Sequence, residues 1–116
     1  MSKKKRDYIF FIQDIKESIE KIEKWTCKIS FKEFSKNEIL IDAVIRNLEI
    51  IGEAARNVPP EIKEKYKDVE WKEAIGFRNI LTHDYFGVDK EAVWDTIIND
   101  LPLLKKHIRE LYNSEK

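Results

Sequence analysis

Apolar residues recur every three or four positions along most of this 116-residue chain, and this spacing constrains its fold more than any other feature. The first such run comprises Tyr8, Phe11, Ile12, Ile15, Ile19 and Ile22. Residues three and four apart share one face of a helix, so the run predicts an amphipathic α-helix of about six turns. The chain contains only three Gly and three Pro, and its apolar spacing is helical rather than alternating. The sequence therefore predicts an all-α protein.

A second helix is predicted from near Asn37 to just before Pro59-Pro60, because the proline rings block its continuation. The segments Ser30–Glu33 and Ser35–Glu38 both match a capping box, which marks the start of a helix. Most of the circumference of the second helix is apolar. Its charged residues form one narrow stripe, which we interpret mainly as a salt-bridged solvent face: Asp42, Arg46, Glu49, Glu53 and Arg56.

The rest of the chain predicts three further segments. Residues 59–68 form a short helical turn that begins at Pro60, and a third helix runs from about Val69 to His83. A fourth helix follows Asp89, its expected N-cap, and Pro102 either kinks or restarts it. Four amphipathic helices with short loops predict one domain over residues 1–116. Its architecture is an antiparallel four-helix bundle with a short extra helical turn between the second and third helices.

Charge is balanced overall but unevenly distributed. The chain has 22 Lys+Arg and 22 Asp+Glu, yet its first six residues carry four basic groups and no acid. Residues 7–116 therefore hold 18 basic and 22 acidic groups, a net charge of −4 (18 − 22). A slightly acidic body will not bind nucleic acid through a broad surface, so such a function requires a local site. The basic segment Lys3–Arg6 could steer RNA, but a basic amino terminus is most often a solvated tail.

Other classes of protein are excluded by composition. The single cysteine, Cys27, cannot form an internal disulfide, and we expect a reduced, partly buried thiol in a cytoplasmic protein. One Cys and two distant His provide no zinc ligand cluster, so no metal site is expected. No apolar run approaches the ~20 residues that a membrane helix needs. The amino terminus does not match a secretory signal.

The apolar pattern fails in the third predicted helix, where Arg78 falls in the apolar seam. Burying an unpaired guanidinium is very costly, so this side chain must meet an acid, a phosphate or water. In one interpretation Arg78 reaches the edge of the bundle and pairs with Glu49 or Glu53. Such a pair would be purely structural.

The other interpretation joins Arg78 with His83 in a catalytic site. Arginine can hold a phosphate and stabilise its transition state, and histidine can move the proton of a ribose hydroxyl. The pair would suffice for metal-free RNA cleavage through the 2′-hydroxyl. Five positions on a continuous helix rotate two residues by about 140°, so they would not converge there. A joint site requires unwinding near His83 or a second copy of the chain, and both fit a homodimer.

The segment from Gly76 to Phe86, GFRNILTHDYF, resembles the Arg-x4-His-x-Tyr signature of HepT-like proteins in the HEPN superfamily. Residues 46–55 resemble the second helix of that family and residues 93–102 its last, so the resemblance covers nearly the whole chain. It implies a HEPN-like four-helix homodimer. It also implies the ribonuclease toxin of a toxin–antitoxin pair. From the chemistry of Arg78 and His83 we expect a metal-independent endoribonuclease that requires no cofactor.

The resemblance also implies residue roles. Arg78 and His83 would be the catalytic pair, and Asn79 would help to orient the phosphate or the histidine. Tyr85 would receive AMP from ATP through a small nucleotidyltransferase antitoxin. Adenylylation would place bulk and negative charge where the RNA phosphate should lie.

Two non-enzymatic interpretations stay open. The chain could be a nucleotide- or partner-binding helical module in which Tyr85 is only a modification acceptor, or it could be a dimerisation scaffold. The three tryptophans could stack on bases, but their helical spacing favours core or interface positions: Trp25, Trp71 and Trp94. His107 is interpreted as a surface or edge histidine rather than a ligand.

Overall fold

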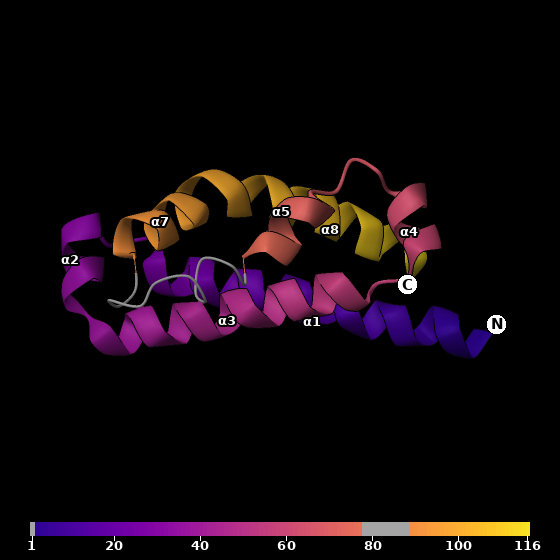
Figure 1. Cartoon of the computed structure of the whole chain (residues 1–116), viewed down its shortest axis with the longest axis horizontal. Coiled ribbons are helices and arrows are strands. Elements are labelled where there is room, and N and C mark those ends of the chain that lie inside the picture. Colours follow the sequence, from indigo (N-terminus) through magenta and orange to yellow (C-terminus); the bar gives the residue numbers. More distant parts are fainter. Residues whose placement is uncertain (1, 78–88) are drawn as a thin grey trace.

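The computed structural model describes residues 2–77 and 89–116, with side chains described from residue 7 onward. Every regular element in these two ranges is helical (Figure 1). The elements are α1 (Ser2–Thr26), α2 (Phe31–Lys36), α3 (Glu38–Asn57), α4 (Pro60–Lys65), α5 (Trp71–Gly76), α7 (Lys90–Asp95), η1 (Thr96–Asp100) and α8 (Leu101–Glu115). The predicted all-α fold is confirmed.

The long helices pack as an elongated bundle. α1 packs along α3 and α8, and α5 packs on α3. Figure 1 shows α1 and α3 beneath the continuous course of α7, η1 and α8. The start of α1 and the end of α8 lie at one end of the molecule, and α2 lies at the opposite end. No helix in the described part of the chain is long and apolar enough to span a membrane.

The core follows the predicted apolar seams. Phe11 is half-buried, whereas the other members of the first predicted run are buried. The central part of the core consists of Ile12, Ile15, Ile19, Ile22, Val44, Leu48, Ile51, Leu104, Ile108 and Leu111. Burying a side chain of this size contributes about 1.5–3 kcal/mol, so these contacts between α1, α3 and α8 dominate the stability of the bundle.

The capping box at the start of α2 is confirmed. The backbone N–H of Glu33 donates to Ser30 Oγ at 3.2 Å, and the backbone N–H of Ser30 donates to Glu33 Oε1 at 3.0 Å. These reciprocal bonds satisfy donors that the first turn of a helix leaves free. They fix the turn between α1 and α2.

The second predicted capping box, Ser35–Glu38, is wrong. Ser35 lies inside α2, and its hydroxyl donates to the Lys32 carbonyl oxygen at 2.9 Å. The N-cap of α3 is instead Asn37, whose Oδ1 accepts from the backbone N–H of Leu40 at 3.0 Å. Only the residue directly before the helix can satisfy its free donors, and α2 does not end until Lys36.

The fourth predicted helix is continuous from α7 through η1 to α8, and η1 is its one irregular turn. Asp89 is its N-cap, as predicted, and accepts from the backbone N–H of Ala92 at 3.0 Å. In η1, a π-helical turn, the backbone N–H of Leu101 donates to the carbonyl oxygen of Thr96, five residues earlier. Pro102 has no N–H to donate, and the wider turn accommodates it within the first turn of α8. The helix therefore neither ends nor restarts at the proline.

The two short helices that precede the Arg78-x4-His83 motif, α4 and α5, agree in part with the prediction. α4 begins at Pro60 as expected. α5 begins at Trp71 rather than Val69, because the backbone N–H of Trp71 bonds to the Val69 carbonyl oxygen in a tight turn at 2.8 Å. The part of the predicted third helix beyond Phe77 lies outside the described residues.

Two side chains at the end of α1 are more exposed than predicted. Cys27 is exposed rather than partly buried, because α1 ends at Thr26 and the thiol lies in the following turn. Trp25 is 37% exposed and is not a core residue, whereas the alternative prediction of an interface position stays a prediction. The other two tryptophans follow the prediction: Trp71 is buried, and Trp94 packs on Phe34 with a ring-centroid separation of 5.1 Å.

Candidate functional site

The four residues of the predicted catalytic and modification site lie outside the described residues: Arg78, Asn79, His83 and Tyr85. The structure does place the two residues between which this segment runs. Phe77 is buried with 3% exposure, and Asp89 caps α7. The described residues on either side of the motif segment are thus a core side chain and a helix cap.

α5 precedes the motif and is held by its side chains, because six residues make too short a helix to be stable alone. Trp71 and Ala74 are buried on it. The indole Nε1 of Trp71 donates to the Tyr66 carbonyl oxygen at 3.0 Å. Among the described residues, a Cβ added to Gly76 would meet nothing within 4 Å, so their packing does not require glycine there.

A polar pair fixes the start of α5 against α8. His107 Nδ1 lies 2.9 Å from Glu70 Oε2 and 3.1 Å from Oε1, and Glu70 is the residue directly before α5. The two side chains are only 19% and 20% exposed. His107 thus lies at an edge of the bundle, as predicted. Its acidic partner was not predicted, because 37 positions separate the two residues.

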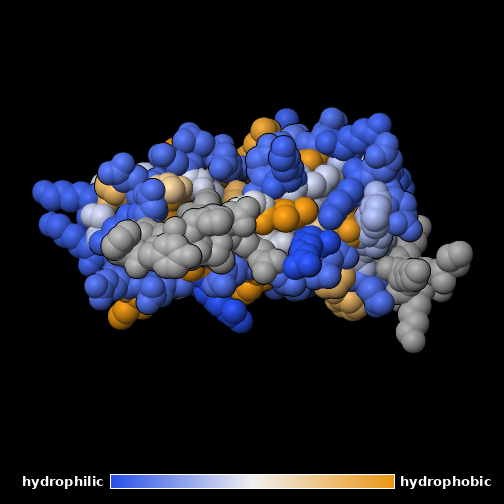
Figure 2. Space-filling model, viewed as in Figure 1, coloured by the Kyte–Doolittle hydropathy of each residue, from blue (hydrophilic) through white to orange (hydrophobic). Residues whose placement is uncertain are grey.

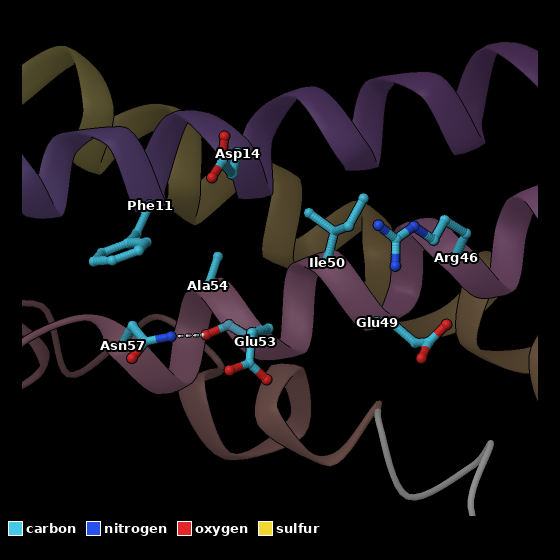
Figure 3. Close-up of a pocket in the computed structure, with 8 residues that line it drawn as sticks. All are labelled: Phe11, Asp14, Arg46, Glu49, Ile50, Glu53, Ala54 and Asn57. Carbon is cyan, nitrogen blue, oxygen red and sulfur yellow. Dashed lines mark hydrogen bonds between the residues drawn. The ribbon is translucent and has the colours of Figure 1, made fainter.

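Glu49 and Glu53 line a pocket between α1 and α3 (Figure 3). The pocket has a volume of about 340 Å³. Its lining residues are Phe11, Asp14, Arg46, Glu49, Ile50, Glu53, Ala54 and Asn57. Asn57 Nδ2 donates to the Glu53 carbonyl oxygen at 2.9 Å. Three carboxylates and one guanidinium give this face an acidic character, which disfavours RNA phosphates.

The predicted exposure of the charged stripe on α3 is confirmed, since all five of its residues are exposed. In Figure 3 the carboxylates of Glu49 and Glu53 point to the same side of α3, away from α1. The expected pairing of Arg78 with either glutamate involves a residue outside the described ranges. It stays a prediction.

Asn47 is a polar residue of α3 that the sequence reasoning missed. It is 6% exposed, and its Nδ2 donates to the Ala43 carbonyl oxygen at 2.9 Å. Its Oδ1 is buried and has no hydrogen-bond donor within the described part of the chain. Native proteins rarely leave such an acceptor unpaired. The signal in the sequence was a single amide beside Leu48 on the apolar side of the second helix.

These features define a small helical-bundle domain that carries a basic and titratable motif between two of its helices. The family model described as "Ribonuclease HepT-like" matches residues 15–111, which is most of the chain. The chain belongs to the HepT-like ribonuclease family, as the resemblance in the sequence predicted.

Curated relatives support this assignment. "Putative RNase MJ1380" of Methanocaldococcus jannaschii is 44% identical over 104 residues, which cover 90% of this chain and 95% of the relative. "Probable ribonuclease HepT" of Thermococcus cleftensis is 41% identical over 107 residues, covering 92% and 97%. "Putative RNase TTE0752" of Caldanaerobacter subterraneus is 47% identical over 88 residues, covering 76% and 79%. No solved structure gives a significant match.

Proposed function

We propose that this chain is a metal-independent endoribonuclease and the toxin of a toxin–antitoxin pair. The observation that carries the proposal is membership of the HepT-like ribonuclease family together with an intact Arg78-x4-His83 motif. Relatives that align over nine tenths of the chain bear names of ribonucleases. The RNA substrate follows from these names and from the chemistry of the two side chains.

In the proposed reaction the ribose 2′-oxygen attacks the adjacent phosphorus. Its proton passes to a neutral His83 imidazole, and the bond from phosphorus to the 5′-oxygen breaks. The products are a 2′,3′-cyclic phosphate and a 5′-hydroxyl, which receives a proton from a protonated imidazole. Arg78 neutralises the charge that develops on the phosphoryl oxygens, and Asn79 orients the phosphate or the histidine.

A homodimer suits this chemistry, because one imidazole must accept a proton while another donates one. Two copies of the chain that face one cleft would supply both His83 side chains and both Arg78 side chains. The same arrangement removes the difficulty that Arg78 and His83 diverge on a single regular helix.

The proposed regulation acts at Tyr85, in the cytoplasm where the RNA targets lie. A small nucleotidyltransferase antitoxin transfers AMP from ATP to the phenol oxygen and releases pyrophosphate. The attached phosphate repels the RNA backbone, and the nucleoside occupies space beside His83. ATP is therefore only the AMP donor of the antitoxin.

The test is RNA cleavage by the purified protein in excess EDTA. We expect products that end in 2′,3′-cyclic phosphate, with loss of cleavage in His83→Ala and Arg78→Ala. A DNA strand of the same sequence is the matched control, because it lacks the attacking hydroxyl. An RNA panel that the unmodified protein leaves intact would contradict the proposal.

The charge of the body favours one alternative, a nucleotide- or partner-binding module without nuclease activity. Residues 7–116 carry a net charge of −4, which does not favour general RNA affinity. Calorimetry with ATP and AMP, and mass spectrometry after co-expression with a small nucleotidyltransferase, would separate the two functions. Nucleotide binding without RNA cleavage would support the alternative.

A further inference from the structure

We propose that the RNA backbone, outside the scissile phosphate, binds to a basic surface at the α2 end of the bundle. This inference rests on the proposed ribonuclease function. The surface, which we call the basic corner, consists of Lys21, Lys24, Lys28, Lys32 and Lys36. Residues 21–36 hold these five lysines and two acids, a net charge of +3 (5 − 2). The remainder of residues 7–116 holds 13 basic and 20 acidic groups, a net charge of −7.

The fold gathers these five charges at one end of the molecule. They lie on the last turns of α1, on the connecting turn and on α2, and all five side chains are exposed. Lys32 and Lys36 are four residues apart on α2 and therefore share one face of that helix. Hydrophilic side chains project beyond the end of the bundle where α2 lies (Figure 2).

The lysines of the basic corner form no ion pairs within the described part of the chain. Both acids of the segment have other partners: Glu23 pairs with Lys105, and Glu33 accepts from the backbone of Ser30. The positive potential of the segment is thus available to an external anion.

Helix stability explains only part of this lysine density. A cation in the last turn of a helix is favourable, which accounts for Lys24 in α1 and Lys36 in α2. Lys32, in contrast, lies in the first turn of α2, where the helix dipole disfavours positive charge. The position of Lys32 is thus unfavourable for the stability of α2 but favourable for binding a polyanion.

An aromatic side chain accompanies these lysines. Trp25 follows Lys24 directly, lies one helical turn after Lys21 and is 37% exposed. Exposed aromatic rings beside basic groups are the usual platform on which bases of single-stranded nucleic acid stack. Part of the ring is thus accessible at the end of the bundle where the basic corner lies.

The basic corner is attached to the helix that follows the motif. Lys90 Nζ donates to the Ser35 carbonyl oxygen at 2.9 Å, and Trp94 packs on Phe31 and Phe34. These contacts join α2 to α7, which begins directly after Asp89 and only seven residues beyond His83 in the sequence. An RNA that lies along the start of α7 could continue onto the basic corner, whereas the acidic pocket between α1 and α3 would repel it.

The test compares two triple variants of equal charge change. K24Q/K28Q/K32Q removes three charges of the basic corner, and K72Q/K106Q/R109Q removes three exposed charges elsewhere. Both are made in the full chain with His83→Ala, so that a 30-nucleotide RNA is bound without being cut. We expect the first variant to raise the Kd at least tenfold and to reduce the slope of log K against log salt by about 2, because each phosphate contact contributes about 0.7. The second should stay within about twofold.

Trp25→Ala provides an independent measurement. Stacking of a base on an aromatic ring strengthens binding without a counterion contribution, so we expect an increase in Kd of about tenfold with an unchanged salt slope. Circular dichroism verifies that each variant is folded. If K24Q/K28Q/K32Q has a lower melting temperature, the double variant K28Q/K32Q retains Lys24 at the end of α1 and allows the same comparison.

The outcomes separate this inference from the proposed ribonuclease. With His83 restored, K24Q/K28Q/K32Q should raise the KM for the long RNA and leave cleavage of a dinucleotide unchanged. If the unmodified protein cuts RNA but both triple variants bind and cut equally well, RNA binding by the basic corner is refuted and the proposed nuclease activity is retained. If no RNA is cut but RNA binding still depends on the lysines of the basic corner, the proposed nuclease activity is refuted and RNA binding by the basic corner is retained. Loss of antitoxin binding with unchanged RNA affinity would also refute the basic corner.

Discussion

The phenol hydroxyl of Tyr8 donates a hydrogen bond to Glu115 Oε1, which joins residues 107 positions apart. The hydroxyl of Tyr66 donates to Oε2 of the same carboxylate, and Lys65 Nζ donates to Oε2 at 2.7 Å. One side chain, only 5% exposed, therefore connects α1, α4 and α8. The bonds from Lys65, Tyr66 and Tyr8 lower the pKa of Glu115 to about 2.

We predict that Glu115→Gln lowers the free energy of unfolding by about 2 kcal/mol at pH 7. Hydrogen bonds to a charged acceptor contribute about 1.5–3 kcal/mol, and the amide accepts through only one of its two polar atoms. Urea denaturation measures the difference. Glu110→Gln, an exposed position on the same helix, is the matched control and should change stability by less than about 0.5 kcal/mol.

The effect of Glu115→Gln should depend on pH in a defined direction. The pKa of Glu115 is lower in the folded protein than its ordinary value of 4.5, so its stabilisation is fully present above that value. It is lost as the pH falls from about 4.5 towards about 2. The difference in unfolding free energy between the native chain and the variant should be constant from pH 5 to 8 and shrink at pH 4 and 3. A difference that stays the same at pH 3 would contradict this assignment.

Asn47→Ala should be tolerated unusually well for a buried position. Its Oδ1 has no partner among the described residues, so truncation removes an unpaired acceptor together with one local bond to Ala43. We expect the free energy of unfolding to change by less than about 1 kcal/mol, against about 2–5 kcal/mol for Leu48→Ala on the same helix. A loss above about 2 kcal/mol at Asn47 would show that its Oδ1 has a partner in the folded protein.

His107 and Glu70 should be energetically coupled. Both side chains are four-fifths buried and lie in direct contact, so the single substitutions to alanine should not be additive. A double-mutant cycle, measured by denaturation at pH 7, should give a coupling energy of about 0.5–1.5 kcal/mol. His107 with Glu64, which pairs with Lys67 instead, provides the null cycle. Equal coupling in both cycles would argue against a specific pair.

Gly76→Ala should stabilise the protein. The added methyl meets nothing within 4 Å in the described part of the chain, and alanine is favoured over glycine in a helix by about 1 kcal/mol. We expect an increase of about 0.5–1 kcal/mol in the free energy of unfolding, measured against Ala74→Gly, which should reverse the sign. Destabilisation by Gly76→Ala would indicate that the motif segment requires glycine before Phe77.

Features set by neighbouring residues were predictable from the sequence. The seams of α1, α3 and α8 follow the helical period directly, and Asp89 caps α7 because its side chain needs only the next three residues. The Glu115 carboxylate could not be predicted, since its partners lie 49 to 107 positions away. The exposure of Cys27 depends on the residue at which α1 ends, which periodicity determines only within a few positions.

For the candidate site, the sequence predicted which residues are exposed but not how their side chains meet. Glu49 and Glu53 lie on an exposed stripe because charge at every third or fourth position of a helix faces away from the core. The roles of Arg78, Asn79, His83 and Tyr85 depend on how their side chains meet, and helical spacing alone does not determine that. They stay predictions. Asn47 was not predicted, because helical periodicity identifies the apolar face as a whole and assigns no role to a single amide on it.

The π turn before Pro102 has a consequence for the phase of the last helix. Val93, Ile97 and Leu101 are buried at successive steps of four residues, each of which would drift by about 40° around a regular α-helix. The wider turn of η1 takes up part of that drift and keeps Leu104 and Ile108 directed at the core. Removing one residue from η1 would rotate the downstream helix by about 100° and turn its apolar seam away from α1. The length of η1, rather than its composition, thus holds α7 and α8 in register with the bundle.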